Sequence, residues 1–449
     1  MTKDMTEGSP LNHIVQFSIP LLLGNVFQQT YNMMDAAIVG KVLGTGALAA
    51  VGSSSSMTFL VLGFCFGLCS GFAIPVAQRF GARQFRDMRQ YIFIALVSTA
   101  VFAIAVTAVC AALCPHILRM LATPPDIFDD AWRYLIVVFL GIPFTMLYNL
   151  LSGILRAVGD SRTPFYFLVL AALLNIALDL CFILVFHWGV AGAALATVVS
   201  QAASGLLCIL LILKKFEVLH VRSEERVWSG EKFRLLLVMG IPMGLQFSIT
   251  AIGSIVMQTA NNRLGSVYVS AFTAGSRIKQ LGISPFDAVG SAVTMFASQN
   301  YGACKMDRVK QGLKEGIALS LLVALVVCPV FIVFSRQLSL LFIPKTETVV
   351  LAAASRYVRC MGCFFWLIAF LQILRPTTQG LGFSNRAIFS GVFEMAARCT
   401  VSFAFVPLFG FSAICFADQS AWVCAVAYIF PTCVWCVRRR EKELSSRPA

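Results

Sequence analysis

The chain has 449 residues, of which 58% are hydrophobic and only 12% are charged, and its net charge is +14 at pH 7. Soluble domains carry about 25% charged residues, so this composition excludes a water-soluble globular protein. It also excludes a disordered chain, because disordered segments are poor in aromatic residues and this chain has 38 phenylalanines. A membrane protein that crosses the bilayer many times remains.

Twelve apolar runs follow one another along the chain, each near the roughly 20 residues that a transmembrane helix needs. They lie at about 14–40, 47–78, 91–115, 131–152, 164–187, 189–213, 235–261, 267–298, 315–335, 349–374, 387–408 and 410–437. A β-barrel would instead show segments of about ten residues with alternating polarity. The segment before the first run is too polar for a signal peptide. We therefore expect an all-α protein with twelve transmembrane helices and a retained first span.

The basic residues predict the orientation of these spans. Of the 35 lysines and arginines, 24 fall in the N-terminal segment, the loops after even-numbered spans and the C-terminal tail, and five fall in the other loops. Cytoplasmic loops carry the excess of basic residues, so both termini are expected in the cytoplasm and the protein in the inner cell membrane. The positive charge is scattered over short segments, which argues against a nucleic-acid partner.

Catalytic and cofactor motifs are missing from the sequence. The four histidines (His13, His116, His187 and His220) are dispersed, and most of the 15 cysteines lie inside apolar runs, so we expect neither a metal site nor a cofactor. No glycine-rich phosphate-binding loop followed by Lys and Ser or Thr occurs, which argues against direct use of ATP. The sequence favours an ion-coupled transporter over an enzyme.

The two halves of the chain repeat each other. Ile19-Pro20 and Ile241-Pro242 open spans 1 and 7, and the segments 78–82 and 299–303, at matching positions of the two halves, both end in Gly-Ala. Six spans therefore repeat with the same polarity, which predicts two six-helix lobes related by a pseudo-twofold axis along the membrane normal. We place the lobes at residues 1–221 and 222–449. A substrate path between such lobes suits alternating access.

Buried carboxylates are rare in the N-terminal half. Span 1 is taken to end near residue 42, about seven residues after Asp35, and span 5 near His187, eight residues after Asp179, while Thr197 lies eight residues into span 6. At 1.5 Å per residue all three share a depth of about 10–12 Å, and Asn175 is on the same helical face as Asp179. These four residues could bind Na⁺ or share protons. The alternative is that they only join neighbouring helices by hydrogen bonds.

The C-terminal half carries more charge inside its spans. Its candidates for a substrate cavity or a second polar centre are Arg277, Lys279, Asp287, Glu394, Arg398 and Asp418. Glu394 and Arg398 are four residues apart and are expected to neutralise each other. Asp418 occupies the repeat position of Thr197. Arg356 and Arg359 lie in the outer third of span 10, where arginine side chains extend to the interface.

Several motifs together resemble the MATE family (multidrug and toxic compound extrusion) of the MOP flippase superfamily, and its DinF-like branch in particular. The matching segments are Pro20 with Asn32–Gly40 and Leu43-Gly44, the two Gln-x-x-Gly-Ala motifs, Gly153–Asp160, and Asn175-x-x-x-Asp179 followed by Gly192–Thr197. The resemblance covers nearly the whole chain. It implies a coupling site in the N-terminal lobe at Asp35, Asn175, Asp179 and Thr197, and a helix-bending role for Pro20. Other branches use a span-7 glutamate, and here Thr250 stands in its place.

The resemblance also implies an activity, which is secondary antiport. A multidrug exporter of this kind releases organic cations or amphiphilic compounds in exchange for H⁺ or Na⁺ by alternating access. The alternative is a flippase of the same superfamily for lipid-linked oligosaccharides or other amphiphiles. Arg277 and Lys279 leave the charge of the substrate open. The expected partners are these small molecules and membrane lipid, without nucleic acid, and we expect a monomer.

Overall fold

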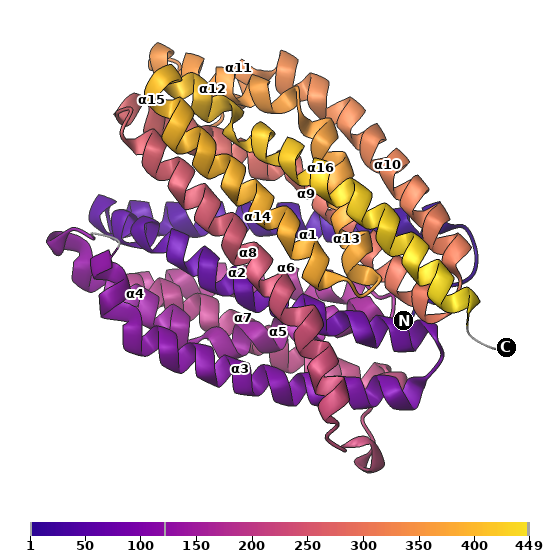
Figure 1. Ribbon diagram of the computed structural model, residues 1–449. Coiled ribbons are helices and arrows are strands. Elements are labelled where there is room, and N and C mark those ends of the chain that lie inside the picture. The colour runs from indigo at the N-terminus through magenta and orange to yellow at the C-terminus, as the bar shows by residue number, and fades with distance from the viewer. Residues whose placement is uncertain (1, 121–122, 447–449) are drawn as a thin grey trace. The chain divides into compact units, whose positions relative to one another are not determined.

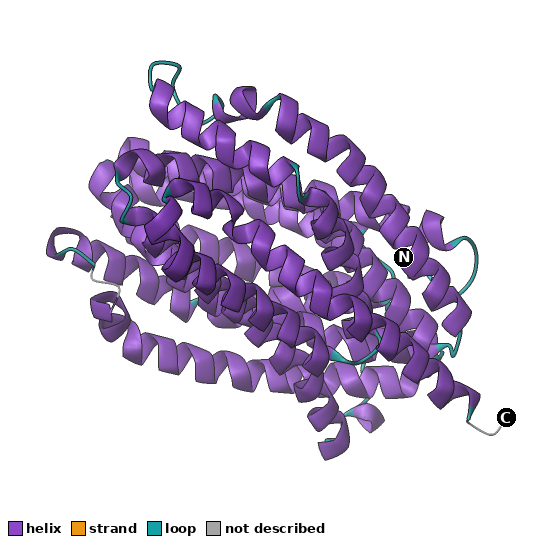
Figure 2. Cartoon of the chain, turned by 45° about the horizontal axis from the view of Figure 1, so that its top comes forward, coloured by secondary structure: helices purple, strands orange, loops and turns teal. Residues whose placement is uncertain are grey.

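The computed structural model describes residues 2–120 and 123–446, without the side chains of Thr45, Leu48 and Met120. Within these ranges the chain consists of helices joined by short loops and contains no strand (Figure 2). The basic tail residue Arg447, which contributes to the predicted orientation, lies outside the described residues.

The helices follow the predicted apolar runs and extend beyond most of them. In order along the chain they are α1 (Pro10–Val42), α2 (Thr45–Gly81), α3 (Phe85–Met120), α4 (Pro125–Leu140), α5 (Ile142–Ala157), α6 (Arg162–Leu180), η1 (Cys181–Val185), α7 (Gly189–Lys215), η2 (Glu217–Leu219), η3 (Ser223–Glu225), α8 (Gly230–Asn262), α9 (Ser266–Gly302), α10 (Met306–Val333), α11 (Ser335–Ser339), α12 (Thr348–Gly362), α13 (Phe365–Gly380), α14 (Ser384–Thr400), η4 (Val401–Phe405), α15 (Val406–Phe409) and α16 (Phe411–Ser445) (Figure 1).

Eight helical segments of the described chain are long and apolar enough to cross a membrane, and two bent pairs, α4 with α5 and α12 with α13, raise this to ten. The two predicted spans that remain are α1 and α9, which have 33 and 37 residues. Both are long enough to cross, but neither contains a continuous stretch as apolar as those of the other spans. The twelve expected spans are therefore all helical, and two of them are broken.

The apolar runs do not predict the breaks in the two bent pairs. The angle between α4 and α5 is 45°, and that between α12 and α13 is 52°. Pro143 explains the first break, because a proline lacks the N–H for an intrahelical bond and collides with the preceding turn. It occupies the first turn of α5, directly after Gly141 and Ile142, which is where a new helix tolerates proline.

The backbone repeats as the sequence does. Residues with positive φ recur at matching positions of the two halves, namely Gly44 and Gly265, Arg83 and Cys304, Gly159 and Gly382, and Gly189 and Gly410. Two π-helical segments, η1 and η4, also occupy matching positions. Irregular backbone is sensitive to its surroundings, so its recurrence shows that the two halves share one local architecture.

Contacts group the chain into two units. Unit 1 comprises residues 1–4 and 23–244, and unit 2 comprises residues 5–22 and 245–449. The predicted lobe boundary after residue 221 therefore falls inside unit 1. Helices α1 and α8 each contribute to both units, and in each the division follows a proline, Pro20 or Pro242, by two residues.

A close glycine contact explains why the first half of α8 belongs to unit 1. Gly67 and Gly71 of α2 face Gly240 and Gly244 of α8, and each pair is spaced four residues apart. A Cβ atom on Gly71 would lie 2.5 Å from the Cα of Gly240, and one on Gly67 would lie 2.5 Å from the carbonyl oxygen of Met243. Small residues at this spacing allow two membrane helices to approach backbone to backbone.

The N-terminal segment explains why the first half of α1 belongs to unit 2. The backbone of Met5 accepts a hydrogen bond from Asn300 and donates one to Gln299, at 3.1 and 2.9 Å. Arg308 donates to the carbonyls of Met5 and Gly8. Met5 is 1% exposed. These bonds attach the segment to the end of α9 and the start of α10.

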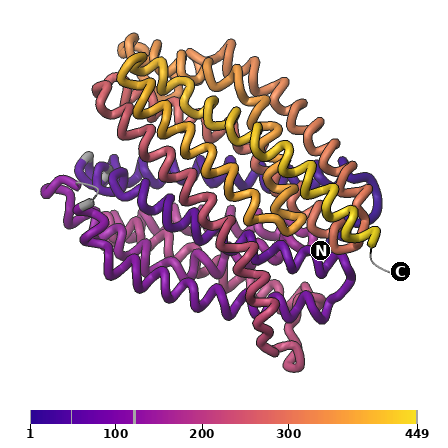
Figure 3. The backbone as a smooth tube through the Cα atoms, in the orientation of Figure 1, coloured from indigo at the N-terminus to yellow at the C-terminus, as the bar shows by residue number. Residues whose placement is uncertain are grey.

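The linker between α7 and α8 belongs to unit 1 and packs against α3. It contains η2 and η3 and forms a compact turn before α8 (Figure 3). Arg89 of α3 donates to both carboxylate oxygens of Glu225 at 2.6 to 2.9 Å, and the Glu225 side chain is 4% exposed. A bidentate pair of this kind fixes both position and orientation, so the most polar segment of the chain has a defined place.

Candidate functional site

Asp35 on α1 and Asp179 on α6 bring their carboxyl groups together inside unit 1. The two side chains are within direct hydrogen-bonding reach of each other. A hydrogen bond between two carboxyl groups requires that one of them carries a proton, because an ionised carboxylate only accepts. The Oδ1 atom of each is buried and has no hydrogen-bond partner among the described residues. The pair is thus arranged to hold one proton between two acids.

Asn175 and Thr197 complete this site. In the orientation that satisfies both ends of the Asn175 amide, its nitrogen donates to Asp179 Oδ2 at 3.2 Å. Its oxygen then accepts from the backbone N–H and the hydroxyl of Thr197, at 3.1 and 3.2 Å. Asn175 is 2% exposed and Asp179 is fully buried. All four predicted residues therefore lie in one cluster, which joins α1, α6 and α7.

Apolar packing positions the acids. Val39, one turn after Asp35, packs in a cluster with Ile183 of η1 and with Val190 and Ala193 of α7. This contact turns the Asp35 face of α1 toward α6 and α7. Asp179 stands two residues before the π-helical segment η1, and such segments in helices are frequent at functional sites.

Sequence reasoning missed two tyrosines near the acids. Tyr31 of α1 and Tyr134 of α4 interact electrostatically with both Asp35 and Asp179. Tyr31 lies four residues before Asp35, so helical spacing is a signal that places it on the same face. Tyr134 has no such signal, because only the packing of α4 places it there. Pro20 lies inside α1, on the N-terminal side of Asp35, and the helix continues through it.

Unit 2 contains a buried ion-pair network, which we define as Lys279, Arg375, Glu394, Arg398 and Asp418. Asp418 accepts from Lys279 Nζ at 2.8 Å and from Arg398 Nε at 2.9 Å. Arg398 also lies 3.5 Å from Glu394, which in turn is paired with Arg375. Asp418 is fully buried and Glu394 and Arg398 are 3–4% exposed. Burying charges is unfavourable unless each has a partner, and here each has one or two.

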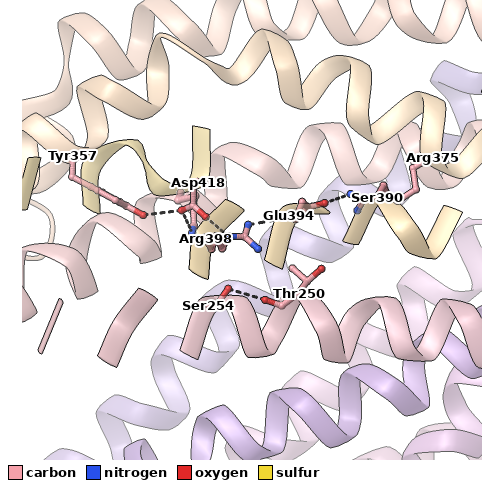
Figure 4. Close-up of polar contacts among 9 residues, drawn as sticks. Thr250, Ser254, Tyr357, Arg375, Ser390, Glu394, Arg398 and Asp418 are labelled. Atoms are coloured by element: carbon pink, nitrogen blue, oxygen red, sulfur yellow. Dashed lines mark hydrogen bonds and ion pairs between the residues drawn. The ribbon is translucent and has the colours of Figure 1, made fainter. Parts of the chain in front are cut away.

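Neutral side chains extend the network at both ends (Figure 4). Tyr357 of α12 donates to Asp418 at 3.1 Å, and Arg375 donates to Ser390 of α14 at 2.9 Å. Figure 4 also shows Thr250 and Ser254 of α8 beside the network, where the hydroxyl of Ser254 bonds the carbonyl of Thr250 at 3.1 Å. Thr250 thus occupies a polar environment without adding a charge.

The remaining predicted residues behave differently from one another. Asp287 of α9 accepts a hydrogen bond from Gln372 of α13 and interacts electrostatically with Arg375. With Asp287 included, three acids face three bases. Arg277 is exposed and has no ion-pair partner among the described residues. The expected pairing of Glu394 with Arg398 is present, but it is one link of a longer network.

Arg375 corrects the sequence interpretation. The end of the tenth apolar run at residue 374 places this arginine among the basic residues of a cytoplasmic loop, but it lies inside α13 and is 9% exposed. The reason is that α13 begins anew after the break at Cys363-Phe364 and runs to Gly380, so it carries Arg375 into the interior. Sequence reasoning also missed Tyr357, Ser390 and Gln372, because neutral residues in apolar runs carry no sequence signal.

Comparison with known proteins places these features in a family. The MatE family model matches residues 20–181 and 242–406. The chain belongs to the MatE family. It is therefore a multi-pass membrane transporter and not an enzyme. The two matched segments contain Asp35, Asn175 and Asp179, but Thr197 and its repeat equivalent Asp418 lie just beyond them.

Relatives of this MatE chain are known from several bacteria. It is 32% identical over 379 residues, 84% of each chain, to the probable multidrug resistance protein YpnP of Bacillus subtilis. It is 24% identical over 370 residues, 80% of each chain, to a protein of Shewanella oneidensis named FAD transporter.

Solved structures share its fold along the whole length. An outward-facing MATE family transporter of the MOP superfamily matches with a TM-score of 0.91 and 23% identity over all of both chains. A MOP superfamily transporter from Pyrococcus furiosus, described as having a binding pocket of reverse polarity, matches with a TM-score of 0.88 and 23% identity over 99% of both chains. The twelve-helix fold expected from the sequence is the fold of these transporters.

Proposed function

We propose that this MatE chain is a secondary antiporter that exports organic cations or amphiphilic compounds by alternating access, with H⁺ taken up in exchange. The observation that carries the proposal is the Asp35–Asp179 pair. The two carboxyl groups lie within hydrogen-bonding reach of each other, and neither forms an ion pair with a described basic residue. Placing charge in a membrane interior is unfavourable, so such a pair favours a state with a bound proton. Multidrug resistance in the name of YpnP supports the class of cargo.

Proton uptake and cargo export are coupled because the outward-facing and inward-facing states differ in their affinities for the proton and the cargo. An outward-facing protein takes a proton onto the Asp35–Asp179 pair, which favours release of the cargo, and an inward-facing one loses the proton and binds cargo again. Such exchange requires that proton and cargo each bind the two states with different affinities. Asn175 holds Asp179 in place by a hydrogen bond, and Thr197 holds Asn175. Na⁺ is the other coupling ion that the oxygen ligands of these residues admit.

The test is transport in inverted membrane vesicles without ATP. We expect an imposed ΔpH to drive accumulation of a fluorescent organic cation, and we expect Asp35→Asn and Asp179→Asn each to reduce it to the level of vesicles that lack the protein. The control is Asp129→Asn, which removes an exposed carboxylate of α4 with no described ion pair and should transport normally.

If only a Na⁺ gradient drives transport, Na⁺ and not H⁺ is the coupling ion at this site. Transport by both Asn variants at the wild-type rate would refute the coupling role of the pair. Transport that requires ATP would refute secondary antiport.

A flippase for amphiphiles with an anionic head group is a second candidate. Arg277 favours it, because this exposed arginine on α9 has no described ion-pair partner and could contact such a group. The name of the Shewanella oneidensis relative, FAD transporter, points to an anionic cargo for that protein. Competition in the vesicle assay separates the candidates, since an excess of an anionic amphiphile should inhibit cation export only if the two share a path.

A further inference from the structure

Three arginines line one pocket of unit 2 that shares no residue with the ion-pair network. The pocket has a volume of about 370 Å³ and is lined by Arg336 of α11 and by one face of α12. The α12 residues are Thr348, Leu351, Ala352, Ser355, Arg356 and Arg359. Ligand pockets have volumes of about 300–1,000 Å³, so this one has room for a small polar group.

The pocket holds positive charge without an acid. None of its lining residues is an aspartate or glutamate, and none of the three arginines forms an ion pair with a described residue. Glu347 immediately precedes α12 but does not line the pocket. All three arginines are exposed, whereas the charges of the ion-pair network are largely buried and each has a partner. Three guanidinium groups that line one pocket without an acid leave their donors available to an anion.

The position of the arginines along α12 adds a second reason for an anionic ligand. Arg356 and Arg359 lie about 12 and 17 Å along the helix from its first residue. Both side chains are exposed, and an unpaired arginine within a membrane span is favourable only where it reaches the interface, water or an anionic partner. In Figure 1, α11 lies at the opposite end of unit 2 from the end of α16. Because the sequence predicts a cytoplasmic C terminus, this end is expected at the outer face.

We propose that this arginine pocket binds a phosphate group at the outer face of unit 2. Arginine suits phosphate, since its planar fork of N–H groups matches two phosphate oxygens at once. Two sources share this chemistry, the head group of an anionic phospholipid in the outer leaflet and a soluble phosphate ester. The pocket is separate from the Asp35–Asp179 pair, so its occupancy does not depend on the antiport that we propose above.

The experiment measures binding to the purified full-length protein by native mass spectrometry in a neutral detergent. The lipid probe is short-chain phosphatidylglycerol, with zwitterionic phosphatidylcholine as the comparison, and the soluble probe is glycerol 3-phosphate. The test variant is Arg356→Gln/Arg359→Gln. The matched control is Arg263→Gln, which removes an exposed arginine between α8 and α9 that lines no part of the pocket.

We expect the double variant to lose about tenfold or more in affinity for one anionic probe, the effect of losing charge-assisted hydrogen bonds. The Arg263→Gln control should bind as the wild type does. If the double variant loses phosphatidylglycerol binding, and glycerol 3-phosphate does not displace this lipid from the wild type, the pocket binds a lipid head group. If the double variant instead loses glycerol 3-phosphate binding, the pocket binds a soluble phosphate ester.

Equal binding by the double variant and the control overturns the proposal, as does the absence of binding to the wild type. If the double variant fails to fold, Arg336→Gln replaces it, because this exposed side chain lies on the separate helix α11 and its loss leaves α12 intact.

Discussion

Asp418 offers a direct measure of how unit 2 stabilises buried charge. This fully buried carboxylate accepts hydrogen bonds from Lys279, Arg398 and Tyr357 at 2.8, 2.9 and 3.1 Å. Asp418→Asn removes the negative charge with little change of shape, so it leaves Lys279 without an anionic partner. Arg398 keeps Glu394 at 3.5 Å. Breaking a buried pair on one side destabilises by about 3–5 kcal/mol, and we expect a loss in that range.

A double-mutant cycle tests this reasoning more sharply than the single variant. Lys279→Met removes the cation that Asp418→Asn leaves unpaired, so the double variant should be less destabilised than the sum of the two single variants by about 0.5–3 kcal/mol, the range of coupling energies between contacting residues. For a cooperative unit of roughly 150–250 residues, each kcal/mol moves the melting temperature by about 2–4 °C. Asp418→Asn should therefore melt at least about 6 °C below the wild type.

The assay is thermal unfolding of the purified protein in detergent, read by tryptophan fluorescence, for the wild type, both single variants and the double variant. Two results would refute the reasoning. One is an Asp418→Asn variant that melts within about 2 °C of the wild type, which corresponds to less than about 1 kcal/mol. The other is strictly additive effects of the two substitutions, since this would show that Lys279 and Asp418 do not stabilise each other.

Two further predictions concern unit 1. Gly71→Ala should destabilise the protein by about 1–3 kcal/mol in a thermal melt, because its methyl group would meet the α8 backbone at Gly240. The control is Gly52→Ala on the same helix, which meets no atom within 4 Å and should be neutral or stabilising. Equal effects of the two substitutions would contradict the glycine contact. Hydrogen bonding by Arg89 lowers the pKa of Glu225, so this pair stabilises the linker fully above the ordinary glutamate pKa of about 4.3 and loses that contribution as the pH falls through the lowered value. Protease cleavage of the linker should therefore increase below about pH 4 in the wild type. Glu225→Gln should be cleaved readily at pH 7, with little further change at acid pH. Cleavage that does not vary with pH in either protein would show that the Arg89–Glu225 pair does not hold the linker in place.

Much of the N-terminal candidate site can be predicted from the sequence, because its residues are found by counting positions along single helices. Asp35 and Asp179 are acids inside apolar runs that contain few others, and counting residues along helices of known rise assigns them a common depth with Thr197. Helical periodicity then places Asn175 beside Asp179. Each step uses only the sequence and the geometry of a straight helix, and the structure brings the four residues into contact.

The C-terminal network can be predicted only in part. The charges of Lys279, Glu394, Arg398 and Asp418 are visible in apolar runs, but their pairing across α9, α14 and α16 is not, apart from the i,i+4 contact. Hydropathy assigns Arg375 to a loop because it shows only where an apolar run weakens, while the break between α12 and α13 decides which residues of the next helix are buried.

The sequence by itself determined that this protein crosses the membrane many times, that its halves repeat and that two acids stand out, because composition, periodicity and spacing along a chain are local properties. Only the tertiary structure decided that α1 and α8 are shared between two units, that five charges form one network and that three arginines of α11 and α12 surround a common pocket. The physical reason is that these features depend on the rotation and close approach of helices that are distant in sequence. Those are set by side-chain packing, such as the glycine contact between α2 and α8, and not by hydropathy.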